Sequence, residues 1–455
     1  MKKHKRSTFS GKLGFVLSAA GASVGLGNIW RFPYLAAKYG GGIFLLVYII
    51  LALTFGYTLI MAETSLGRMT RKSPVGAFES FGNSRFISIG GWINAIIPIL
   101  IVPYYSVIGG WVIKYLIEYF AGHSKTLAGD AYFTTFISNG WSTEICFIIF
   151  TLFTLGIIYA GVRNGIERVS KFMMPILIVL SLIIAVYSVT RSGAIEGVKY
   201  FLVPNFDHFS WMTVVSAMGQ MFYSLSIAMG ILITFGSYMK KDTSIEKSTE
   251  NVEIFDTAIA IMAGLMIIPA VFAFSGGNAE TLKSGPALMF ITIPKVFANM
   301  GFGTAIGVVF FLLVLFAAVT SSIALTESAV STFEDELHWS RKKSTVFMGM
   351  VMLLLGTLSC LGYGPLANFK ILGMQFLDFF DFITNSVMMP IAAIATCLLV
   401  SKVVGVDKIE EEIKKDGQAF RRKKIFCFMI KYLCPLFAAI ILISSVANAF
   451  GIITM

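Results

Sequence analysis

Glycines, an asparagine and an arginine interrupt an apolar segment near the start of the chain, in the run Gly21-Ala-Ser-Val-Gly-Leu-Gly-Asn-Ile-Trp-Arg-Phe-Pro33. An uninterrupted membrane helix gains nothing from this composition. In hydrocarbon an unpaired amide or carbonyl is costly, so a broken helix persists only where protein, ions or a polar ligand satisfy the freed groups. The segment therefore predicts a binding site for an ion or a polar molecule.

A second interruption, Tyr223-Ser-Leu-Ser-Ile-Ala-Met-Gly230, follows roughly five predicted spans later. Two breaks in corresponding helices, an odd number of spans apart, are typical of an inverted repeat with the ligand between its halves. Small residues in a single membrane helix more often indicate close helix packing, and this alternative applies to each break alone. The additional polar residues Asn28, Arg31 and Asp256 favour a binding site.

The rest of the chain must supply the helices that position these breaks. Of its 455 residues, 56% are hydrophobic and only 13% are charged, and the mean hydropathy is +0.79. Such values exclude an ordinary soluble protein and predict an all-α polytopic membrane protein with about eleven transmembrane helices. Apolar runs of spanning length begin near Leu13, Ile43, Ile89, Ile145, Phe172, Met212, Ala258, Thr304, Val346, Ile371 and Ile425.

No low-complexity linker divides the chain, so we expect one membrane domain over residues 1–455. Its first repeat should cover about 10–190 and its second about 205–400, with an additional helix at about 425–453. The long polar stretches 121–141 and 278–295 are expected outside, and 402–424 inside. The last is expected to form a solvated helix, with a plain linker as the alternative.

Basic residues cluster at the amino terminus and in alternate loops, as in Arg68, Arg71 and Lys72 or Arg421 to Lys424. The positive-inside rule places these clusters, and the amino terminus, in the cytoplasm of a multi-pass protein of the cell inner membrane. The net charge of +11 could also suggest nucleic acid or acidic lipid as a partner. Orientation alone accounts for its distribution, so no nucleic acid and no obligate protein partner are inferred.

The sequence contains no hydrolytic or phosphate-binding motif, and its five cysteines lack metal-ligand spacing, so an enzyme is not expected. The polar groups of the predicted spans are hydroxyls, amides, isolated carboxylates and carbonyls freed by the breaks. This inventory suits a hard monovalent cation such as sodium.

Several ordered motifs together resemble the neurotransmitter:sodium symporter family: Gly25-Leu-Gly-Asn-Ile-Trp-Arg-Phe-Pro33, Gly40-Gly-Gly42, Thr320-Ser-Ser322, and Asp378 with Asp381. The resemblance covers nearly the whole chain and is greatest to the bacterial amino acid transporters. It implies a LeuT-type fold, with a 5+5 inverted repeat in which helices 1 and 6 are broken. It also implies two bound Na+ ions as the cofactors and a small-molecule amino acid as the substrate, within a lipid bilayer.

The resemblance assigns ligands to both ions. Sodium site 1 would comprise Ala22, Asn28, Ser224 and Asp256, together with the substrate carboxylate. Sodium site 2 would comprise the carbonyls of Gly21, Val24 and Ala317 and the hydroxyls of Thr320 and Ser321. As the alternative, Thr320 and Ser321 could merely hydrogen-bond back to their own helix.

Asp256 departs from the animal members, which have a sodium-binding asparagine at the matching position, while Ala260 stands where they have a chloride-binding serine. A fixed carboxylate would supply the charge that chloride otherwise brings, so we predict chloride-independent transport. The alternative is an interfacial aspartate at the start of the seventh helix.

For the substrate, the resemblance implies that the amides of Leu26 and Gly27 and the hydroxyl of Tyr105 bind its carboxylate. Carbonyls near Tyr223 and Ser226 would take the ammonium. The complete predicted set is Ala22, Leu26, Gly27, Ile101, Tyr105, Tyr223, Ser224, Ser226, Met229, Ser321 and Leu325. The side-chain pocket contains no charge, which favours neutral hydrophobic L-amino acids, including aromatic ones. A methionine and aromatic stripe is otherwise typical of a core.

Two pairs of oppositely charged residues are predicted to close the outer and inner ends of the substrate path. Arg31 would pair with Asp381 above the substrate, directly or through water, with Tyr105 and Tyr223 as a lid. On the cytoplasmic side Arg6 would pair with Asp335 beside Phe9. The alternatives for the inner pair are ordinary positive-inside charge and an acidic helix end.

The same resemblance implies supporting roles for three further residues. Glu63, at the end of the second helix, would cap amides of the broken sixth helix, or else pair with Arg68. Gly165 and Pro175 would allow local unwinding of the fifth helix, so that water reaches sodium site 2.

Together these features predict a sodium-coupled symporter that works by alternating access. A non-transporting amino acid sensor on the same scaffold is the alternative. A channel is disfavoured because the residues outline an occluded pocket with two gates.

Overall fold

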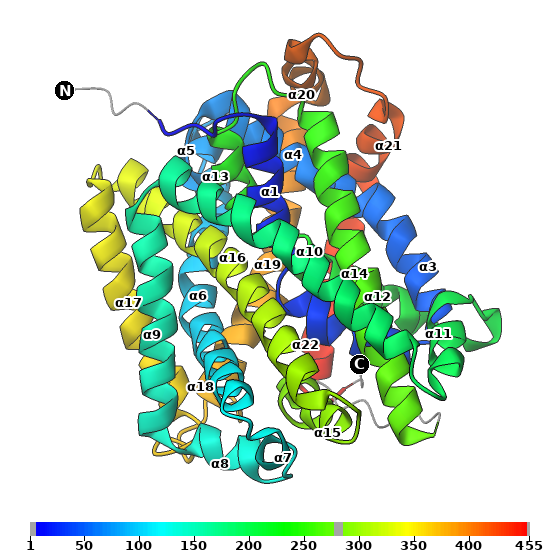
Figure 1. Ribbon diagram of the computed structural model, residues 1–455. Coiled ribbons are helices and arrows are strands. Elements are labelled where there is room, and N and C mark those ends of the chain that lie inside the picture. The colour runs from blue at the N-terminus through cyan, green and yellow to red at the C-terminus, as the bar shows by residue number, and fades with distance from the viewer. Residues whose placement is uncertain (1–5, 277–284, 453–455) are drawn as a thin grey trace.

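Helices make up nearly all the regular structure of the computed structural model, which describes residues 6–276 and 285–452 (Figure 1). Within these residues the only strand-like pairings are two isolated bridges, Gly41 with Pro204 and Ile371 with Met374. Three predicted features fall partly outside them: the basic amino terminus, the stretch 278–295 and the end of the last helix.

Nine helices in the described residues are long and apolar enough to cross a membrane. Their apolar lengths follow from the hydrophobic runs of the sequence, because every backbone amide of a span must find a partner within its own helix. They are α3–η2–α4 (Gly42–Leu51, Ala52–Gly56, Tyr57–Thr70), α6 (Arg85–Phe120), α9 (Gly140–Tyr159), η3–α10 (Val162–Glu167, Arg168–Val189), α14 (Ile245–Ser275), α16 (Gly303–Glu336), α17 (Arg341–Leu361), α18–η7–α19–η8 (Phe376–Asp381, Phe382–Met388, Met389–Leu398, Leu399–Val404) and α21–η10–α22 (Lys423–Phe428, Met429–Leu433, Cys434–Ala449).

Both predicted breaks are present. Helix α1 (Lys12–Ser23) ends three residues before η1 (Gly27–Arg31) and α2 (Phe32–Lys38), and the two halves are bent by 52°. Helices α12 (Trp211–Ser224) and α13 (Ile231–Ser237) flank the second break, residues 225–230. Counting the first broken pair as one span brings the nine helices of the described residues to ten. The second broken pair, α12 with α13, stands where the sequence predicts the eleventh.

The second break contains two non-glycine residues with left-handed backbone, Ser226 with φ 52° and Ala228 with φ 59°. A side chain in this conformation costs roughly 1–2 kcal/mol, which glycine avoids. Ala228 therefore holds a backbone conformation that glycine would adopt without this cost, and it adds strain to the break.

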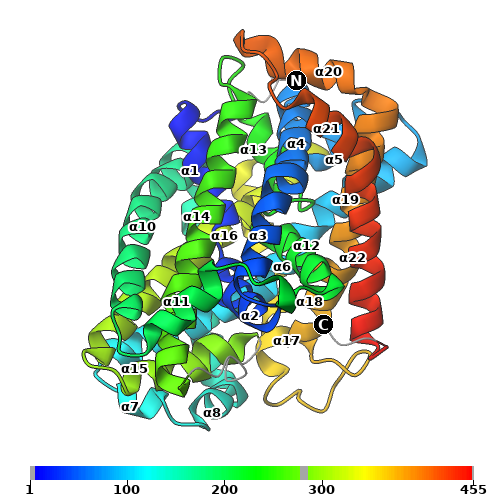
Figure 2. The same ribbon diagram turned by 90° about the vertical axis from the view of Figure 1, so that its right-hand side faces the viewer.

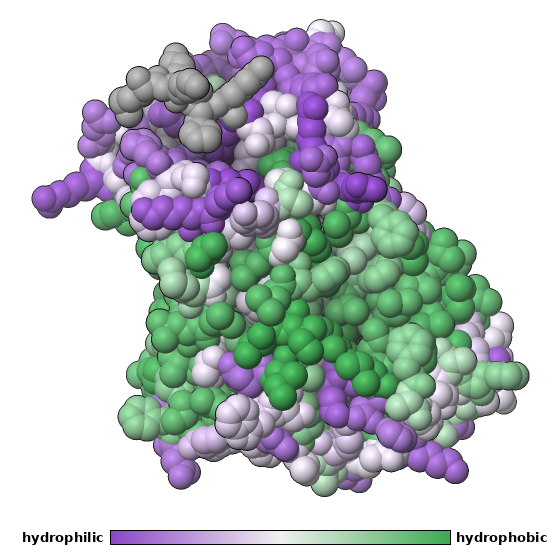
Figure 3. All heavy atoms as spheres, turned by 60° about the vertical axis from the view of Figure 1, so that its left-hand side comes forward, coloured by the Kyte–Doolittle hydropathy of each residue, from purple (hydrophilic) through white to green (hydrophobic). Residues whose placement is uncertain are grey.

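Short helices cover the two ends of the bundle. These are α5 (Pro74–Glu79), α7 (Ser124–Leu127), α8 (Tyr132–Ser138), α11 (Ala194–Leu202), η4 (Phe206–His208), η6 (Leu288–Thr292), α15 (Ile293–Ala298), α20 (Val406–Ile413) and η9 (Lys414–Asp416). Helices α5 and α20 lie at the end that carries the amino terminus, and α7, α8 and α15 at the other (Figures 1 and 2). A broad hydrophobic band separates the two polar ends in Figure 3, as expected for a protein that crosses a bilayer.

The broken helices occupy the centre of the bundle. Helix α1 packs against α10, α14 and α16, while α13 packs against α4 and α12 against α3. Helix α16 in turn packs along α6. The freed backbone groups of both breaks therefore lie inside protein, which is where irregular backbone can persist at membrane depth.

Two expectations about local structure need correction. Glu63 does not end its helix, because α4 continues to Thr70. The loop 402–424 does contain a helix, α20, but this helix is not fully solvated. Ile409, Glu412 and Ile413 are buried against the bundle.

Candidate functional site

A fully buried carboxylate, Asp256, joins the two broken helices. It lies well inside α14, so the alternative of an interfacial aspartate at the helix start is wrong. Asn28 Nδ2, after the first break, donates to Asp256 Oδ1 at 2.8 Å. Ser224 Oγ, at the second break, donates to the same oxygen at 2.8 Å. The residues predicted for sodium site 1 therefore converge from three separate helices.

Ala22 connects this cluster to the rest of the site. Its carbonyl oxygen accepts hydrogen bonds from Ser226 Oγ at 2.9 Å and from Ser321 Oγ at 3.2 Å. Ala22 and Asn28 also line the same cavity. The carbonyls of Gly21 and Ala22, which are predicted for different sodium sites, are thus neighbours in α1.

Sequence analysis missed Tyr48 in α3, whose hydroxyl donates to Asp256 Oδ2 at 2.9 Å and lies 3.0 Å from Ser224 Oγ. It is completely buried. The available signal was weak, since a single tyrosine in the apolar run Gly42-Ile-Phe-Leu-Leu-Val-Tyr-Ile-Ile-Leu51 is also typical of a core. Its contact with the carboxylate shows that it positions Asp256.

Replacing this hydroxyl gives a specific prediction. Tyr48→Phe should raise the sodium concentration for half-maximal uptake by about tenfold, because loss of a hydrogen bond to a buried carboxylate costs about 1.5–3 kcal/mol. Sodium titration of initial uptake rates in proteoliposomes measures the shift. Tyr119→Phe is the matched control, because the Tyr119 hydroxyl is also buried but has no hydrogen-bond partner in the part of the chain that the structure describes. An equal shift in both variants would contradict the assignment.

The residues predicted for sodium site 2 lie together, but the two hydroxyls behave differently. Ser321 Oγ donates across to α1, with Gly21 O at 3.3 Å and Val24 O at 3.5 Å. Thr320 Oγ1 donates back to its own helix, to Phe316 O at 3.0 Å and Ala317 O at 3.2 Å. The alternative of purely backward hydrogen bonds therefore describes Thr320 and not Ser321.

A cavity lies between the two breaks, α6 and α16. Ten of the eleven predicted substrate residues line it: Ala22, Leu26, Gly27, Ile101, Tyr105, Tyr223, Ser226, Met229, Ser321 and Leu325. The eleventh, Ser224, lies behind them against Asp256. Ser23, Gly25 and Asn28 complete the lining, so no side chain in it carries a charge.

The cavity has a volume of about 30 Å³, which is room for about two water molecules. The ring of Tyr223 lies directly on Gly27, where an added Cβ would meet Cδ1 at 2.1 Å. The Leu26 amide donates to the Tyr105 hydroxyl at 3.4 Å, and Gln220 Nε2, which sequence analysis missed, donates to Gly27 O at 3.1 Å. A whole amino acid fits only after the lining side chains move outward.

On one side of Tyr223 a larger cavity of about 380 Å³ leads away from the site. Arg31 and Asp381 both line it, but they form no direct ion pair in the described part of the chain. Arg31 lies over the Tyr223 ring at 5.4 Å, and Asp381 accepts hydrogen bonds from Asn385 at 2.5 Å and Tyr104 at 3.2 Å. The predicted outer pair therefore faces a common vestibule without direct contact.

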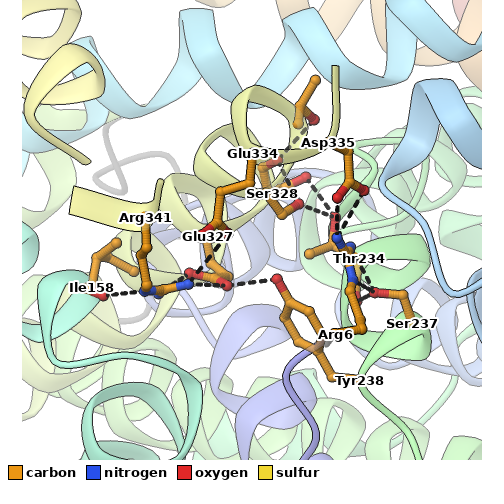
Figure 4. A network of polar contacts seen from close by, with 12 residues as sticks. Arg6, Ile158, Thr234, Ser237, Tyr238, Glu327, Ser328, Glu334, Asp335 and Arg341 are labelled. Atoms are coloured by element: carbon orange, nitrogen blue, oxygen red, sulfur yellow. Dashed lines mark hydrogen bonds and ion pairs between the residues drawn. The ribbon is translucent and has the colours of Figure 1, made fainter. Parts of the chain in front are cut away.

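On the opposite side the predicted inner pair is in direct contact (Figure 4). Arg6 Nη1 donates to both oxygens of Asp335 at 2.6 and 2.7 Å, and Arg6 Nη2 donates to Ser237 Oγ at 2.8 Å. The Ser73 amide also donates to Asp335, at 2.6 Å. The alternatives, an acidic helix end for Asp335 and an orienting charge for Arg6, therefore do not account for their direct contact.

A second layer of this contact was missed. Tyr238, under the Arg6 guanidinium at 4.9 Å, donates its hydroxyl to Glu327 Oε1 at 2.7 Å (Figure 4). Arg341 donates to the other oxygen of Glu327 at 2.5 Å. Burial alone would lower the pKa of Arg6, but the electrostatic influence of Tyr238 and Asp335 more than offsets it and raises the pKa above its ordinary value. The guanidinium therefore stays charged.

The supporting residues are placed as follows. Glu63 Oε1 accepts a hydrogen bond from the Ala228 amide at 2.6 Å, within the second break. The alternative partner Arg68 is instead engaged with Glu412, 2.7 Å away, and both side chains are buried. Gly165 lies in η3, where a Cβ would meet Ile157 O at 2.0 Å, and Pro175 lies within α10. The helix from Val162 to Val189 is unbroken, so the predicted unwinding is not present in this structure.

Comparison with known proteins identifies the family of this chain. The family model of the sodium:neurotransmitter symporter family matches residues 6–147 and 137–452. The chain belongs to the sodium:neurotransmitter symporter family. Like others of this family, the symporter is a multi-pass, sodium-dependent transporter, and its fold is of the LeuT type.

Its relatives include bacterial and animal proteins. An uncharacterized sodium-dependent transporter of Bacillus subtilis, YhdH, is 33% identical over 100% of both chains. The sodium- and chloride-dependent GABA transporter ine of Drosophila melanogaster is 26% identical over 96% of this chain and 51% of its own length. Among solved structures, MhsT in complex with L-phenylalanine is 34% identical, covers 97% of this chain and 100% of its own, and gives a TM-score of 0.87.

Proposed function

We propose that this symporter imports neutral hydrophobic L-amino acids, including aromatic ones, with sodium and without chloride. The observation that carries the proposal is the position of Asp256. Its buried carboxylate is bound by Asn28, Ser224 and Tyr48 beside a cavity whose lining is uncharged. A fixed negative charge there supplies what a bound anion would otherwise supply.

Two sodium ions account for the polar groups of the breaks. The first would be held by Ala22, Asn28, Ser224 and Asp256, and by the carboxylate of the substrate, which couples the two binding events. The second would be held by carbonyls of α1 and by the hydroxyls of Thr320 and Ser321. Inward movement of each positive charge gains about 2.3 kcal/mol per 100 mV, which drives accumulation.

The uncharged lining supports the substrate class. A charged side chain would lie there without compensation, whereas an apolar side chain would meet Ile101, Met229 and Leu325. The similar structure of MhsT holds L-phenylalanine. Methionine is flexible enough to repack around side chains of different shapes, so Met229 suits a range of apolar substrates.

The two gates support alternating access. The contact of Arg6 with Asp335 closes the side that carries the amino terminus, while the vestibule lined by Arg31 and Asp381 reaches down to Tyr223 on the other side. The basic loops favour an amino terminus on the cytoplasmic side of the inner membrane. In that orientation the vestibule opens to the outside. The conformation then corresponds to a transporter closed toward the cytoplasm.

Uptake in proteoliposomes tests the proposal. An inward sodium gradient should drive accumulation of labelled tryptophan, tyrosine, phenylalanine and leucine, and not of lysine or glutamate. Replacing chloride by gluconate should leave the rate unchanged. Binding without accumulation would instead identify an amino acid sensor on the same scaffold.

The pocket gives a prediction about selectivity. Met229 is 5% exposed and lines the cavity, so Met229→Phe should narrow it and lower uptake of tryptophan at least tenfold relative to leucine. Competition of each amino acid against labelled leucine measures the ratio. Met218→Phe, at a buried position outside the cavity lining, controls for general effects of added volume. An unchanged tryptophan-to-leucine ratio in Met229→Phe would place the side chain of the substrate elsewhere.

A further inference from the structure

Two lysines on one helix have no ion pair or hydrogen bond with any described residue. Lys424 lies in α21 and Lys431 in η10, and both are exposed. The neighbouring Lys423, by contrast, pairs with Glu410 at 2.5 Å, and Glu410 also pairs with Lys414 at 2.6 Å. Among residues 6–276 and 285–452, no side chain therefore serves as a counter-ion for Lys424 or Lys431.

The two lysines share one face with two aromatic side chains. Lys424 and Lys431 are seven residues apart, which is nearly two helical turns, and both line the same hollow on the surface. Phe428 and Tyr432 lie on the same face, 54% and 64% exposed, with ring centroids 5.8 Å apart. Together these four side chains, with Lys423 and Cys427, line a shallow hollow on the surface.

This face is turned toward the bilayer. The span Lys423–Ala449 is only 33% buried in its most apolar window, the lowest value among the nine spans. It forms an outer edge of the bundle in Figure 2. Lys431 lies eight residues from the start of the helix, or about 12 Å into it. A lysine at this depth keeps its charge only where its ammonium reaches the headgroup level or a partner.

The geometry of the helix allows both lysine side chains to reach the same depth in the membrane, at the lipid headgroups. The Cα–Cβ bonds of an α-helix tilt toward its amino-terminal end, which is here the end with the basic loops. The Lys431 side chain can therefore extend back toward Lys424 and place its ammonium at the headgroup level. Two ammonium groups meet there beside two exposed aromatic rings.

We propose that Lys424 and Lys431, with Phe428 and Tyr432, bind the headgroup of an anionic phospholipid of the cytoplasmic leaflet. The lysines neutralise the phosphate-bearing headgroup, and the aromatic rings pack against its glycerol and upper acyl region. A second copy of this chain is a poor occupant, because a two-fold dimer would set the same lysines against each other. The site is independent of which substrate the protein transports.

Lipid retention measures this site directly. The protein is purified in mixed micelles of phosphatidylglycerol and phosphatidylcholine, and bound lipid is counted by native mass spectrometry. The wild type should retain phosphatidylglycerol in preference to phosphatidylcholine. In the variant Lys424→Gln/Lys431→Gln the ratio of bound phosphatidylglycerol to bound phosphatidylcholine should fall by about an order of magnitude. Each lysine near an anionic surface contributes about 1 kcal/mol of attraction. Thermal unfolding in nanodiscs with and without phosphatidylglycerol gives a second readout.

The control variant is Lys402→Gln/Lys408→Gln, which removes two other exposed lysines that have no ion pair within the described residues. It should retain phosphatidylglycerol as the wild type does. Equal retention in both double variants would overturn the proposal. So would equal retention of the two lipids by the wild type, or a lipid-independent dimer that only Lys424→Gln/Lys431→Gln disrupts.

Discussion

Asp256→Asn should abolish sodium-driven uptake, while the wild type should transport at full rate when gluconate replaces chloride. Asp256 is completely buried and receives hydrogen bonds from Asn28, Ser224 and Tyr48. Removing one charge from a buried ion pair costs about 3–5 kcal/mol, which corresponds to more than a hundredfold loss of sodium affinity. Initial uptake rates as a function of sodium concentration measure the effect.

A double variant makes this prediction more specific. Ala260 is fully buried one turn after Asp256. The double variant Asp256→Asn/Ala260→Ser should therefore create an anion site beside the first sodium site. It should regain part of the uptake, and only when chloride is present. Asp207→Asn removes an exposed aspartate and should transport normally. Chloride-dependent uptake by the wild type would refute the proposed role of the carboxylate.

Breaking the contact between Arg6 and Asp335 should open the cytoplasmic side. Arg6→Ala loses the hydrogen bonds to Asp335 and Ser237 together, so we expect accumulation to fall at least tenfold. Accessibility gives the direction of the change. In a background without native cysteines, Thr234→Cys on the buried face of α13 should react with a maleimide several times faster in the Arg6→Ala protein.

Two further variants separate the gate from simple charge loss. Lys12→Gln removes an exposed cation six residues after Arg6 and should change neither uptake nor labelling. The exchange Arg6→Asp/Asp335→Arg should recover only part of the closure, because Ser73 and Ser237 are placed for the native order of charges. Unchanged labelling of Thr234→Cys in the Arg6→Ala protein would show that other contacts close this side.

The helices and their two breaks could be predicted because each follows from local composition. Apolar runs of membrane length predict spans, and glycine, serine and asparagine within such runs predict freed backbone. The positions of Asn28, Ser224 and Asp256 were also predictable, through ordered motifs that fix which broken segments face each other.

Other features depend on distances that no local pattern encodes. Tyr48 resembles a core tyrosine until the fold brings its hydroxyl to Asp256. Glu63 and Arg68 are close in sequence and suggested a local pair, yet Arg68 engages Glu412, 344 positions away. Arg31 and Asp381 line one cavity without direct contact, and a distance between two side chains on different helices cannot be read from the sequence.

The buried pair of Arg68 and Glu412 limits how the molecule can move. Arg68 also donates to the carbonyls of Thr243 and Glu412, so separating α4 from α20 would leave two charges uncompensated, at a cost of about 3–5 kcal/mol. Helix α20 is therefore fastened to α4, and we expect the two helices to move together. Gly405 and Gly417, with φ angles of 86° and 80°, lie on either side of α20 and η9 and are the positions where we expect this loop to bend.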